Sequence, residues 1–175
     1  MEIIKTNFCN FVILDVDLKK LKYKSNEKQV LYYNTKTPRK NNLTFENFLY
    51  LQKCIEKGTN EIMKSYDQNY KFDIFVSSIW EHEYLNKDFQ EDHVHYTEHF
   101  SFIIYTKGTP GTIFKNPCGY YLQSMYPKFN DYLATYEVRP KVSKGQMIFF
   151  PSYIPHYVVQ TSKTKTVVGD IQIKR

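Results

Sequence analysis

A succession of short strand-like segments begins after Phe72, and this pattern constrains the fold more than any other feature of the chain. β-Branched and aromatic residues dominate each segment, and turns rich in glycine, proline or asparagine separate them. Short strands joined in this way favour antiparallel pairing in a sandwich or jelly roll. The segments are Asp73 to Trp80, Phe100 to Thr106, Thr135 to Val138, Gln146 to Phe150, His156 to Gln160 and Lys165 to Ile173.

The chain before Phe72 has a different pattern. Two apolar runs, Phe11 to Leu14 and Val30 to Tyr33, favour short strands. Thr44 then offers an N-cap, and apolar residues recur at roughly helical spacing, which predicts one long helix or two shorter ones. Gly58 is expected to break or bend this segment. We therefore expect an α+β chain, with N-terminal helices followed by a jelly roll.

The length of 175 residues favours a single domain, with residues 1–71 packing on a core formed by residues 72–175. No apolar run approaches the roughly 20 residues that cross a bilayer, and the N-terminus lacks a secretion signal, so we expect a cytoplasmic protein. Cys9, Cys54 and Cys118 are widely spaced and fit reduced thiols.

Partners are only weakly indicated by composition. The net charge is +6, but the lysines are scattered, so a solvated surface is favoured over a nucleic-acid partner. The aromatic residues of the N-terminal part are compatible with a homodimer contact. Nothing in the composition identifies a substrate.

Three histidines form the strongest functional pattern. In an extended strand His93 and His95 point to the same side, roughly 7 Å apart. Joined by His156 from a distant strand, they can cap one face of a metal ion and leave the other face open. Such facial triads usually include a carboxylate, whereas here the partner is a second histidine. The plainer interpretation is a set of surface or core histidines without a metal.

Several motifs, taken in order, resemble a family of 2-oxoglutarate/Fe(II)-dependent oxygenases of phages and marine bacteria. The resemblance covers about residues 74 to 173. It includes a tryptophan-bearing strand, a QxxHxH stretch, a strand beginning with serine and ending in tyrosine, a turn like FEDP, and a strand like FPSWLPH. In this chain they are Ser78-Ile79-Trp80, Gln90 to His95, Ser101 to Tyr105, Ile113 to Pro117, and Phe149-Phe150-Pro151-Ser152-Tyr153-Ile154-Pro155-His156.

This resemblance implies a double-stranded β-helix (a cupin-like jelly roll), and Fe(II) held by His93, His95 and His156. It implies that 2-oxoglutarate and O₂ are cosubstrates for hydroxylation of an unidentified substrate. The family carries a basic residue, usually arginine, after the distal histidine to bind the distal carboxylate of 2-oxoglutarate. Lys165 falls closest to that place, although lysine offers a point charge instead of a paired hydrogen bond. Ser101 and Tyr105 can add hydrogen bonds.

Other residues near the motifs have two interpretations. Gln90, Glu91 and Glu98 are either further ligands or partners that orient an imidazole, or solvated loop residues. His82 and His99 have no motif partner and are interpreted as structural. Trp80 can line a pocket or pack in the core. The aromatic tract from Gly119 to Tyr132 is expected to be a long loop at the mouth of the barrel.

Two other functions stay open. Gly145 to Gln160 follows the second cupin motif, with Tyr153 in place of a glycine and Gln160 in place of an asparagine. A cupin of this kind binds metal without 2-oxoglutarate, as an isomerase, a cosubstrate-free dioxygenase or a ligand sensor. Glu98 lies too close to His95 for the first cupin motif. The other alternative is a non-enzymatic binding module whose histidines cluster by chance.

Overall fold

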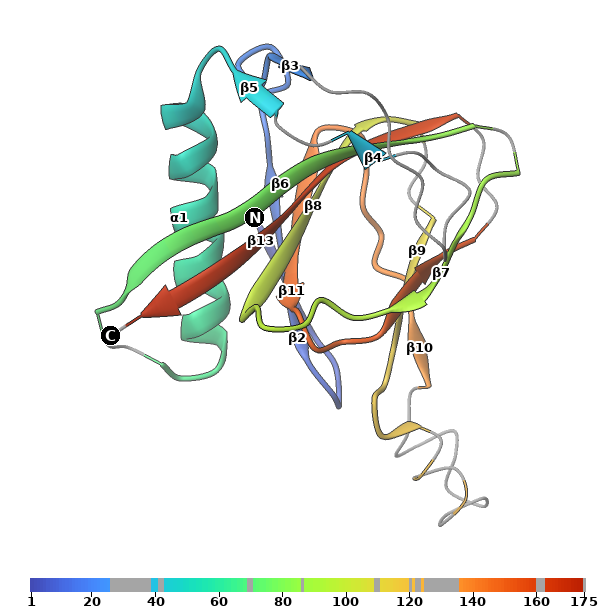
Figure 1. Ribbon diagram of the computed structural model, residues 1–175. Coiled ribbons are helices and arrows are strands. Elements are labelled where there is room, and N and C mark those ends of the chain that lie inside the picture. The colour runs from blue at the N-terminus through green and yellow to red at the C-terminus, as the bar shows by residue number, and fades with distance from the viewer. Residues whose placement is uncertain are drawn as a thin grey trace.

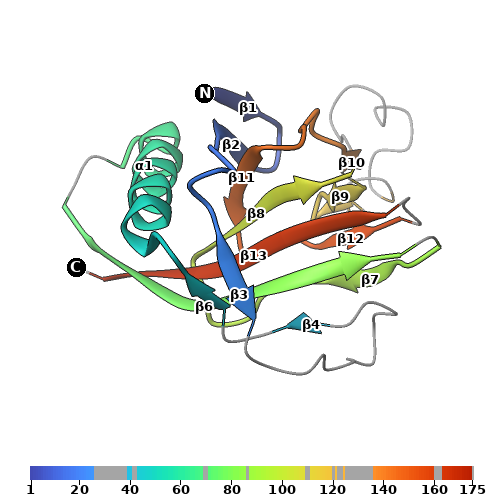
Figure 2. The ribbon, with the colours of Figure 1, turned by 90° about the horizontal axis from the view of Figure 1, so that it is seen from above.

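The chain folds into two antiparallel β-sheets that face each other, and helix α1 (Phe48–Ser65) lies against the outer face of the larger sheet (Figure 1). Seen from above, the smaller sheet lies on the side away from α1 (Figure 2). The computed structural model describes residues 1–25, 39–40, 43–68, 71–85, 87–108, 111–119, 121, 124, 136–159 and 163–174.

The larger sheet has the strand order β1–β2–β11–β8–β13–β6–β4, and the smaller has the order β10–β9–β12–β7. Strands β3 and β5 form a separate pair. The larger sheet contains β1 (Glu2–Lys5), β2 (Asn10–Asp15), β4 (Arg39–Lys40), β6 (Asp73–Tyr84), β8 (Phe100–Lys107), β11 (Gln146–Pro151) and β13 (Thr164–Lys174). The other strands are β3 (Tyr23–Ser25), β5 (Leu43–Phe45), β7 (Gln90–His93), β9 (Thr112–Lys115), β10 (Glu137–Val138) and β12 (His156–Val158).

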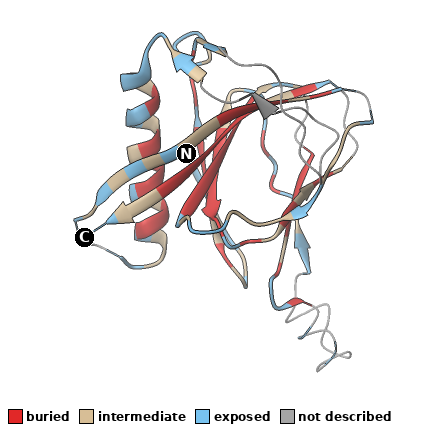
Figure 3. Cartoon of the chain, viewed as in Figure 1, coloured by how far each residue is buried: buried red, intermediate tan, exposed pale blue. Residues whose placement is uncertain are grey.

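The central strands β2, β8 and β11 are buried on both faces, which explains why they are almost wholly apolar. Along β11, Met147 and Phe149 belong to the core under α1, whereas Ile148 and Phe150 belong to the core between the sheets. Successive side chains of a strand alternate faces, so one apolar run supplies both cores. Figure 3 shows the buried residues along these strands and on the face of α1 turned toward them. The predicted strand-rich antiparallel architecture is therefore confirmed.

The expectation of N-terminal helices is wrong for the described residues, where α1 is the only helix of any length. It begins after Asn47, whose side-chain oxygen accepts a hydrogen bond from the Tyr50 amide at 3.1 Å. Thr44, the predicted N-cap, lies in β5 instead. The short strands β1, β2, β3 and β5 precede the helix, because the aromatic and β-branched residues there pair before the helical spacing begins.

Gly58 neither breaks nor bends α1, contrary to the expectation from sequence. The helix runs continuously through it, and a Cβ at this position would lie only 2.0 Å from Cε2 of Phe149. The helix therefore lies close against β11 at Gly58, and the missing side chain makes room for the Phe149 ring.

Two predicted segments lie outside the described residues, wholly or in large part. They are the strand from Val30 to Tyr33 and the aromatic loop from Gly119 to Tyr132. Across the described parts of the chain, no helix combines the length and apolarity needed to span a bilayer.

Replacing Gly58 by alanine should destabilise the protein, even though alanine is favoured over glycine in helices by about 1 kcal/mol. The new methyl group must displace the Phe149 ring or the helix, and overpacking of this kind typically costs about 1–3 kcal/mol. Urea unfolding should give a loss of about 1–2 kcal/mol in the free energy of unfolding. Asn60→Ala, on the exposed face of the same helix, is the control and should stabilise slightly. A stabilised Gly58→Ala variant would contradict the close packing.

Candidate metal centre

Three histidines from two distant segments of the sequence meet between the two sheets. His93 is the last residue of β7 and His156 the first residue of β12, and the two are paired in register. His95 follows two residues after the end of β7. The nitrogens of the three rings that can bind a metal all lie within 4.8 Å of one another. The structure thus brings together the residues singled out as metal ligands in the sequence.

The sequence predicts that His93 and His95 lie on one strand. This prediction is wrong, because β7 ends at His93 and His95 follows beyond it. The backbone N–H of His95 donates to the carbonyl of Ser152 at 3.0 Å, and the N–H of Ser152 donates to the carbonyl of His99 at 3.1 Å. These bonds hold the segment after β7 against the turn after β11. The rings of His93 and His95 are stacked as a result, with centroids 5.4 Å apart.

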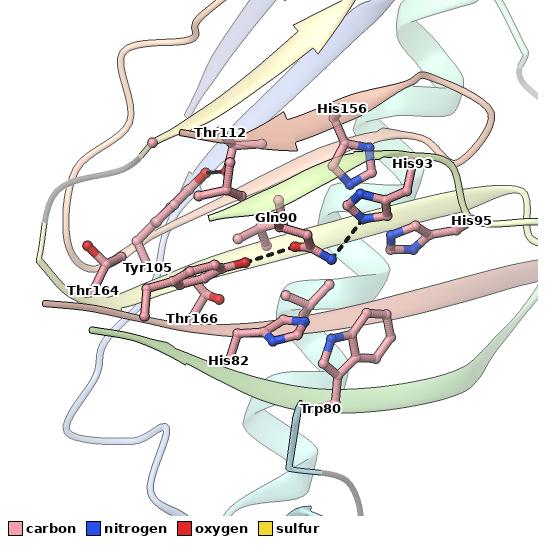
Figure 4. A pocket seen from close by; sticks show the side chains of 15 residues that line it. Trp80, His82, Gln90, His93, His95, Tyr105, Thr112, His156, Thr164 and Thr166 are labelled. Atoms are coloured by element: carbon pink, nitrogen blue, oxygen red, sulfur yellow. Dashed lines mark hydrogen bonds between the residues drawn. The ribbon is translucent and has the colours of Figure 1, made fainter. Parts of the chain in front are cut away.

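Hydrogen bonds fix the same tautomer in all three rings. Each Nδ1 faces an oxygen that can only accept, so each Nδ1 carries the proton and each Nε2 keeps a lone pair for a metal. Figure 4 shows the three rings directed toward one another at one end of a pocket. The acceptors are the carbonyl of Glu91 for His93 at 2.8 Å, the carbonyl of Ile154 for His156 at 3.0 Å, and the carboxylate of Asp170 for His95 at 2.5 Å.

Burial favours the neutral imidazole at two of the three histidines, His93 and His156. Burial and the neighbouring His93 and His95 rings hold the pKa of His156 well below its ordinary value. Burial also lowers the pKa of His93, although its hydrogen bond to the carbonyl of Glu91 opposes this shift. A metal competes with protons for the imidazole lone pair, so rings kept neutral are ready to bind one.

Asp170 on β13 supports His95 from behind, and no sequence motif identified it. Its side chain is largely buried and accepts hydrogen bonds from Ser101 at 2.8 Å and Ser78 at 3.0 Å as well as from His95. Burial alone would raise the pKa of Asp170, but the hydrogen bonds from His95, Ser101 and Ser78 outweigh burial and lower it. The one signal in the sequence is an acidic residue inside an otherwise apolar strand, Val167-Val168-Gly169-Asp170-Ile171.

Ser101, expected to bind the cosubstrate, lies in the same buried network. Its hydroxyl is 2.7 Å from the hydroxyl of Ser152 and 3.1 Å from Nδ1 of His95. Ser101 therefore contacts the side of His95 that faces away from the metal position. Tyr105, the other residue expected to contact the cosubstrate, does line the pocket, where its hydroxyl donates to Thr112 at 2.9 Å.

The pocket extends from the histidines toward a group of hydroxyl-bearing side chains (Figure 4). Gln90 lies across it: its oxygen accepts from Tyr84 at 2.8 Å and its nitrogen is 3.2 Å from Nε2 of His93. The remaining free cavity is about 20 Å³, enough for about one water molecule. Apolar walls are provided by Trp80, Ile103, Val158 and Val168, and hydroxyls by Tyr84, Tyr105, Thr112, Thr164 and Thr166.

Lys165 lies on the other face of the larger sheet. Because side chains alternate along β13, Thr164 and Thr166 line the pocket, while the ammonium of Lys165 points away. That ammonium pairs with Glu81 at 3.1 Å, and Glu81 also accepts a hydrogen bond from Tyr23. The structure therefore does not bring Lys165 to the metal centre. Lysine and arginine are both absent from the described residues that line the pocket.

The other polar residues considered in the sequence have separate positions. His82 lines the pocket, although it was interpreted as structural, and Trp80 both lines the pocket and belongs to the core between the sheets. The side chain of Glu98 accepts a hydrogen bond from Ser77 at 2.8 Å. His99 accepts one from the amide of Ile173 at 3.3 Å. Neither Glu98 nor His99 faces the three ligand nitrogens.

The sequence matches no family model and no curated protein. Solved structures of similar fold include an oxidoreductase of the 2OG-Fe(II) oxygenase family from Burkholderia pseudomallei, with a TM-score of 0.51, 12% identity, and coverage of 93% of this chain and 85% of that chain. They also include a prolyl-4-hydroxylase from Pseudomonas putida, with a TM-score of 0.54, 11% identity, and coverage of 87% and 78%. At these identities the likeness establishes the fold.

The centre has the properties of a site for a divalent transition metal. Imidazole nitrogens suit iron, zinc, copper and nickel. A metal with bonds of about 2.1 Å at right angles would hold its nitrogens about 3 Å apart. The ligand nitrogens lie within 4.8 Å of one another, so the rings would have to move closer together to hold such an ion. An ion held there would lie at the end of the pocket, where other ligands could reach it.

The metal-free protein should lose stability as the pH falls from 7.5 to 5.5. The folded state keeps the pKa of His156 well below its ordinary value of about 6.5, so the unfolded chain binds more protons in this window. The stabilising contribution of neutral His156 is present above about pH 6.5 and is lost as the pH falls below it. Urea unfolding at several pH values measures the slope.

His156→Asn should reduce that slope, and the part that remains is expected from His93, whose pKa burial also lowers. A wild-type slope that His156→Asn does not change would contradict a neutral, buried His156.

Proposed function

We propose that the protein is an Fe(II)- and 2-oxoglutarate-dependent oxygenase that hydroxylates a substrate still to be identified. The observation that carries this proposal is the convergence of three imidazoles at one end of a pocket, each held through its Nδ1 and with its Nε2 directed toward the other two. The fold supports it, since it is shared with a solved structure described as an oxidoreductase of the 2OG-Fe(II) oxygenase family and with one described as a prolyl-4-hydroxylase. Iron with 2-oxoglutarate and O₂ would supply the oxidation of a C–H bond.

His93, His95 and His156 would hold the metal on one face. Gln90 donates toward the same Nε2 lone pair of His93 that a metal would use, so metal binding displaces this contact. The free cavity is also too small for 2-oxoglutarate while Gln90 bridges Tyr84 and His93. Gln90 must therefore rotate out of the pocket when metal and cosubstrate bind.

The hydroxyl-lined end of the pocket would bind the distal carboxylate of 2-oxoglutarate. Tyr105, Thr112, Thr164 and Thr166 offer neutral hydrogen bonds there, in place of the basic residue expected from the family resemblance. Hydrogen bonds to a charged group each contribute about 1.5–3 kcal/mol, so a cluster of them can replace one cation. The apolar walls formed by Trp80, Ile103, Val158 and Val168 would exclude water around the metal.

A metal-binding protein of the cupin type that does not use 2-oxoglutarate is the second candidate. The position of Lys165 favours it, because its ammonium pairs with Glu81 and faces away from the pocket. A pocket lined by neutral hydrogen-bonding groups suits an uncharged ligand at least as well as a dicarboxylate. The two candidates share the metal centre and differ in the cosubstrate.

Calorimetry under anaerobic conditions with Fe(II) or Mn(II) tests the metal centre. The wild type should bind one ion per chain, and His156→Ala should weaken binding more than about 100-fold, since losing a ligand costs more than losing a partner of a ligand. His99→Ala serves as the control and should bind as the wild type does. Equal metal affinity of His156→Ala and wild type would rule out this centre.

Titration of the metal-loaded protein with 2-oxoglutarate separates the two candidates. Binding should require the metal, and Thr166→Val should weaken it about 10-fold, because a hydrogen bond to the carboxylate is lost. Lys165→Gln is the matched control on the adjacent residue of β13 and should leave the affinity unchanged. Metal binding without any 2-oxoglutarate binding would favour the second candidate. Loss of affinity in Lys165→Gln would contradict the assignment of faces on β13.

A further inference from the structure

The position of Asp170 is set by strand pairing on both sides. Asp170 is paired in register with Ser78 on β6 and with Ser101 on β8. These same two serines donate hydrogen bonds to its carboxylate, to Oδ2 from Ser78 and to Oδ1 from Ser101. A register shift between Asp170 and Ile171 marks a bulge at this point of the β6–β13 pair. Bulges re-aim side chains next to functional sites.

Burying the carboxylate costs free energy, and among the described residues no lysine or arginine is paired with it. An unpaired buried charge costs several kcal/mol, and neutral hydroxyls offset only part of this cost. Asp170 is 8% exposed, and its hydrogen-bonding partners are Ser78, Ser101 and Nδ1 of His95. The buried negative charge therefore lies one imidazole ring away from the position of the metal.

The three-histidine set lacks a carboxylate ligand, and Asp170 lies close enough to supply a negative charge indirectly. A facial triad usually brings a carboxylate into direct contact with the metal, whereas three neutral imidazoles leave the full positive charge of the ion on the centre. His95 occupies one of the ligand positions, and the carboxylate of Asp170 lies behind that ring. A carboxylate bonded to Nδ1 fixes the ring and makes Nε2 a stronger ligand.

We propose that Asp170 is the positioning residue of the metal centre, and that it supplies through His95 the negative charge that a facial triad carries as a ligand. This inference rests on the metal centre of the proposed function. Ser78 and Ser101 hold the carboxylate in place, and Ser152 holds Ser101. His95 transmits the effect to the metal, and Asp170 itself does not touch the ion.

Asn and Ala at position 170 separate charge from orientation. Asp170→Asn keeps an oxygen that can accept the Nδ1 proton of His95 but removes the charge, whereas Asp170→Ala removes both. Competition with a chelator for Mn(II) and Zn(II) should show affinity lowered about 10- to 100-fold in Asp170→Asn, and lowered further in Asp170→Ala. Wild-type affinity in Asp170→Asn would overturn the charge role of Asp170.

Glu81→Gln is the matched control for the loss of a buried carboxylate. Glu81 is 2% exposed and lies in the same sheet, but it faces away from the pocket and pairs with Lys165. Its substitution should leave the metal affinity unchanged. An equal loss of affinity in Glu81→Gln and Asp170→Asn would mean that any buried charge in this sheet matters, which would also overturn the proposal.

NMR of the metal-free protein gives a second test, which reads the protonation of the His95 ring directly. Long-range ¹⁵N–¹H spectra should show His95 protonated at Nδ1, with its Hδ1 proton shifted downfield by the short bond to Asp170. In Asp170→Ala, Ser101, whose hydroxyl is 3.1 Å from Nδ1, can donate to that nitrogen and should shift the ring toward the Nε2-protonated tautomer. A wild-type His95 protonated at Nε2 would overturn the proposal.

The metal affinities of the wild type and of Asp170→Asn together distinguish a failure of the proposed function from a failure of this inference. If the wild type bound no metal ion, both the metal centre and this inference would fall. If the wild type bound metal and Asp170→Asn bound it equally well, the metal centre would stand and only the role of Asp170 would fail.

Discussion

The pairing of β12 with β7 on one side and β9 on the other is the constraint on which the candidate site depends. It places His156 opposite both His93 and Phe114. Phe114 is in turn fixed to the larger sheet, since its ring lies 4.8 Å from the rings of both Phe11 and Phe150. The histidines are therefore held by a packed core, and a shift of one residue in this pairing would turn His156 out of the pocket.

The candidate metal centre buries polar groups, and each of them needs a hydrogen-bond partner to offset the cost of losing water. Three imidazoles and a carboxylate lie beside a core of aromatic and aliphatic side chains, and polar groups are tolerated there only when they are hydrogen-bonded. Two backbone carbonyls, Asp170 and a set of serines satisfy the outer nitrogens. The inner nitrogens of the rings are left for a metal, which is why the arrangement favours a metal site over a structural histidine cluster.

The strands and the three histidines could be predicted from sequence, because alternation along a strand and the spacing of two histidines are local patterns. The bend that takes His95 off β7 and the role of Asp170 could not. Asp170 lies 75 residues from His95 in the chain, and only the register of β6, β8 and β13 brings them together. Lys165 lies between Thr164 and Thr166, which both line the pocket. The number of residues that separate it from His156 does not determine which face of β13 its side chain takes. From sequence alone, Gly58 predicted a break in the helix. Its actual role could not be predicted, because the Phe149 ring that occupies the space beside it belongs to a distant strand.

X-ray absorption spectroscopy of the protein loaded with one equivalent of Fe(II) tests the central claim most directly. The account predicts scattering from three imidazole rings bound through nitrogen at about 2.0–2.2 Å, with the remaining positions filled by oxygen. A spectrum with oxygen ligands alone, or with fewer imidazoles than the structure brings together, would contradict a metal centre formed by His93, His95 and His156.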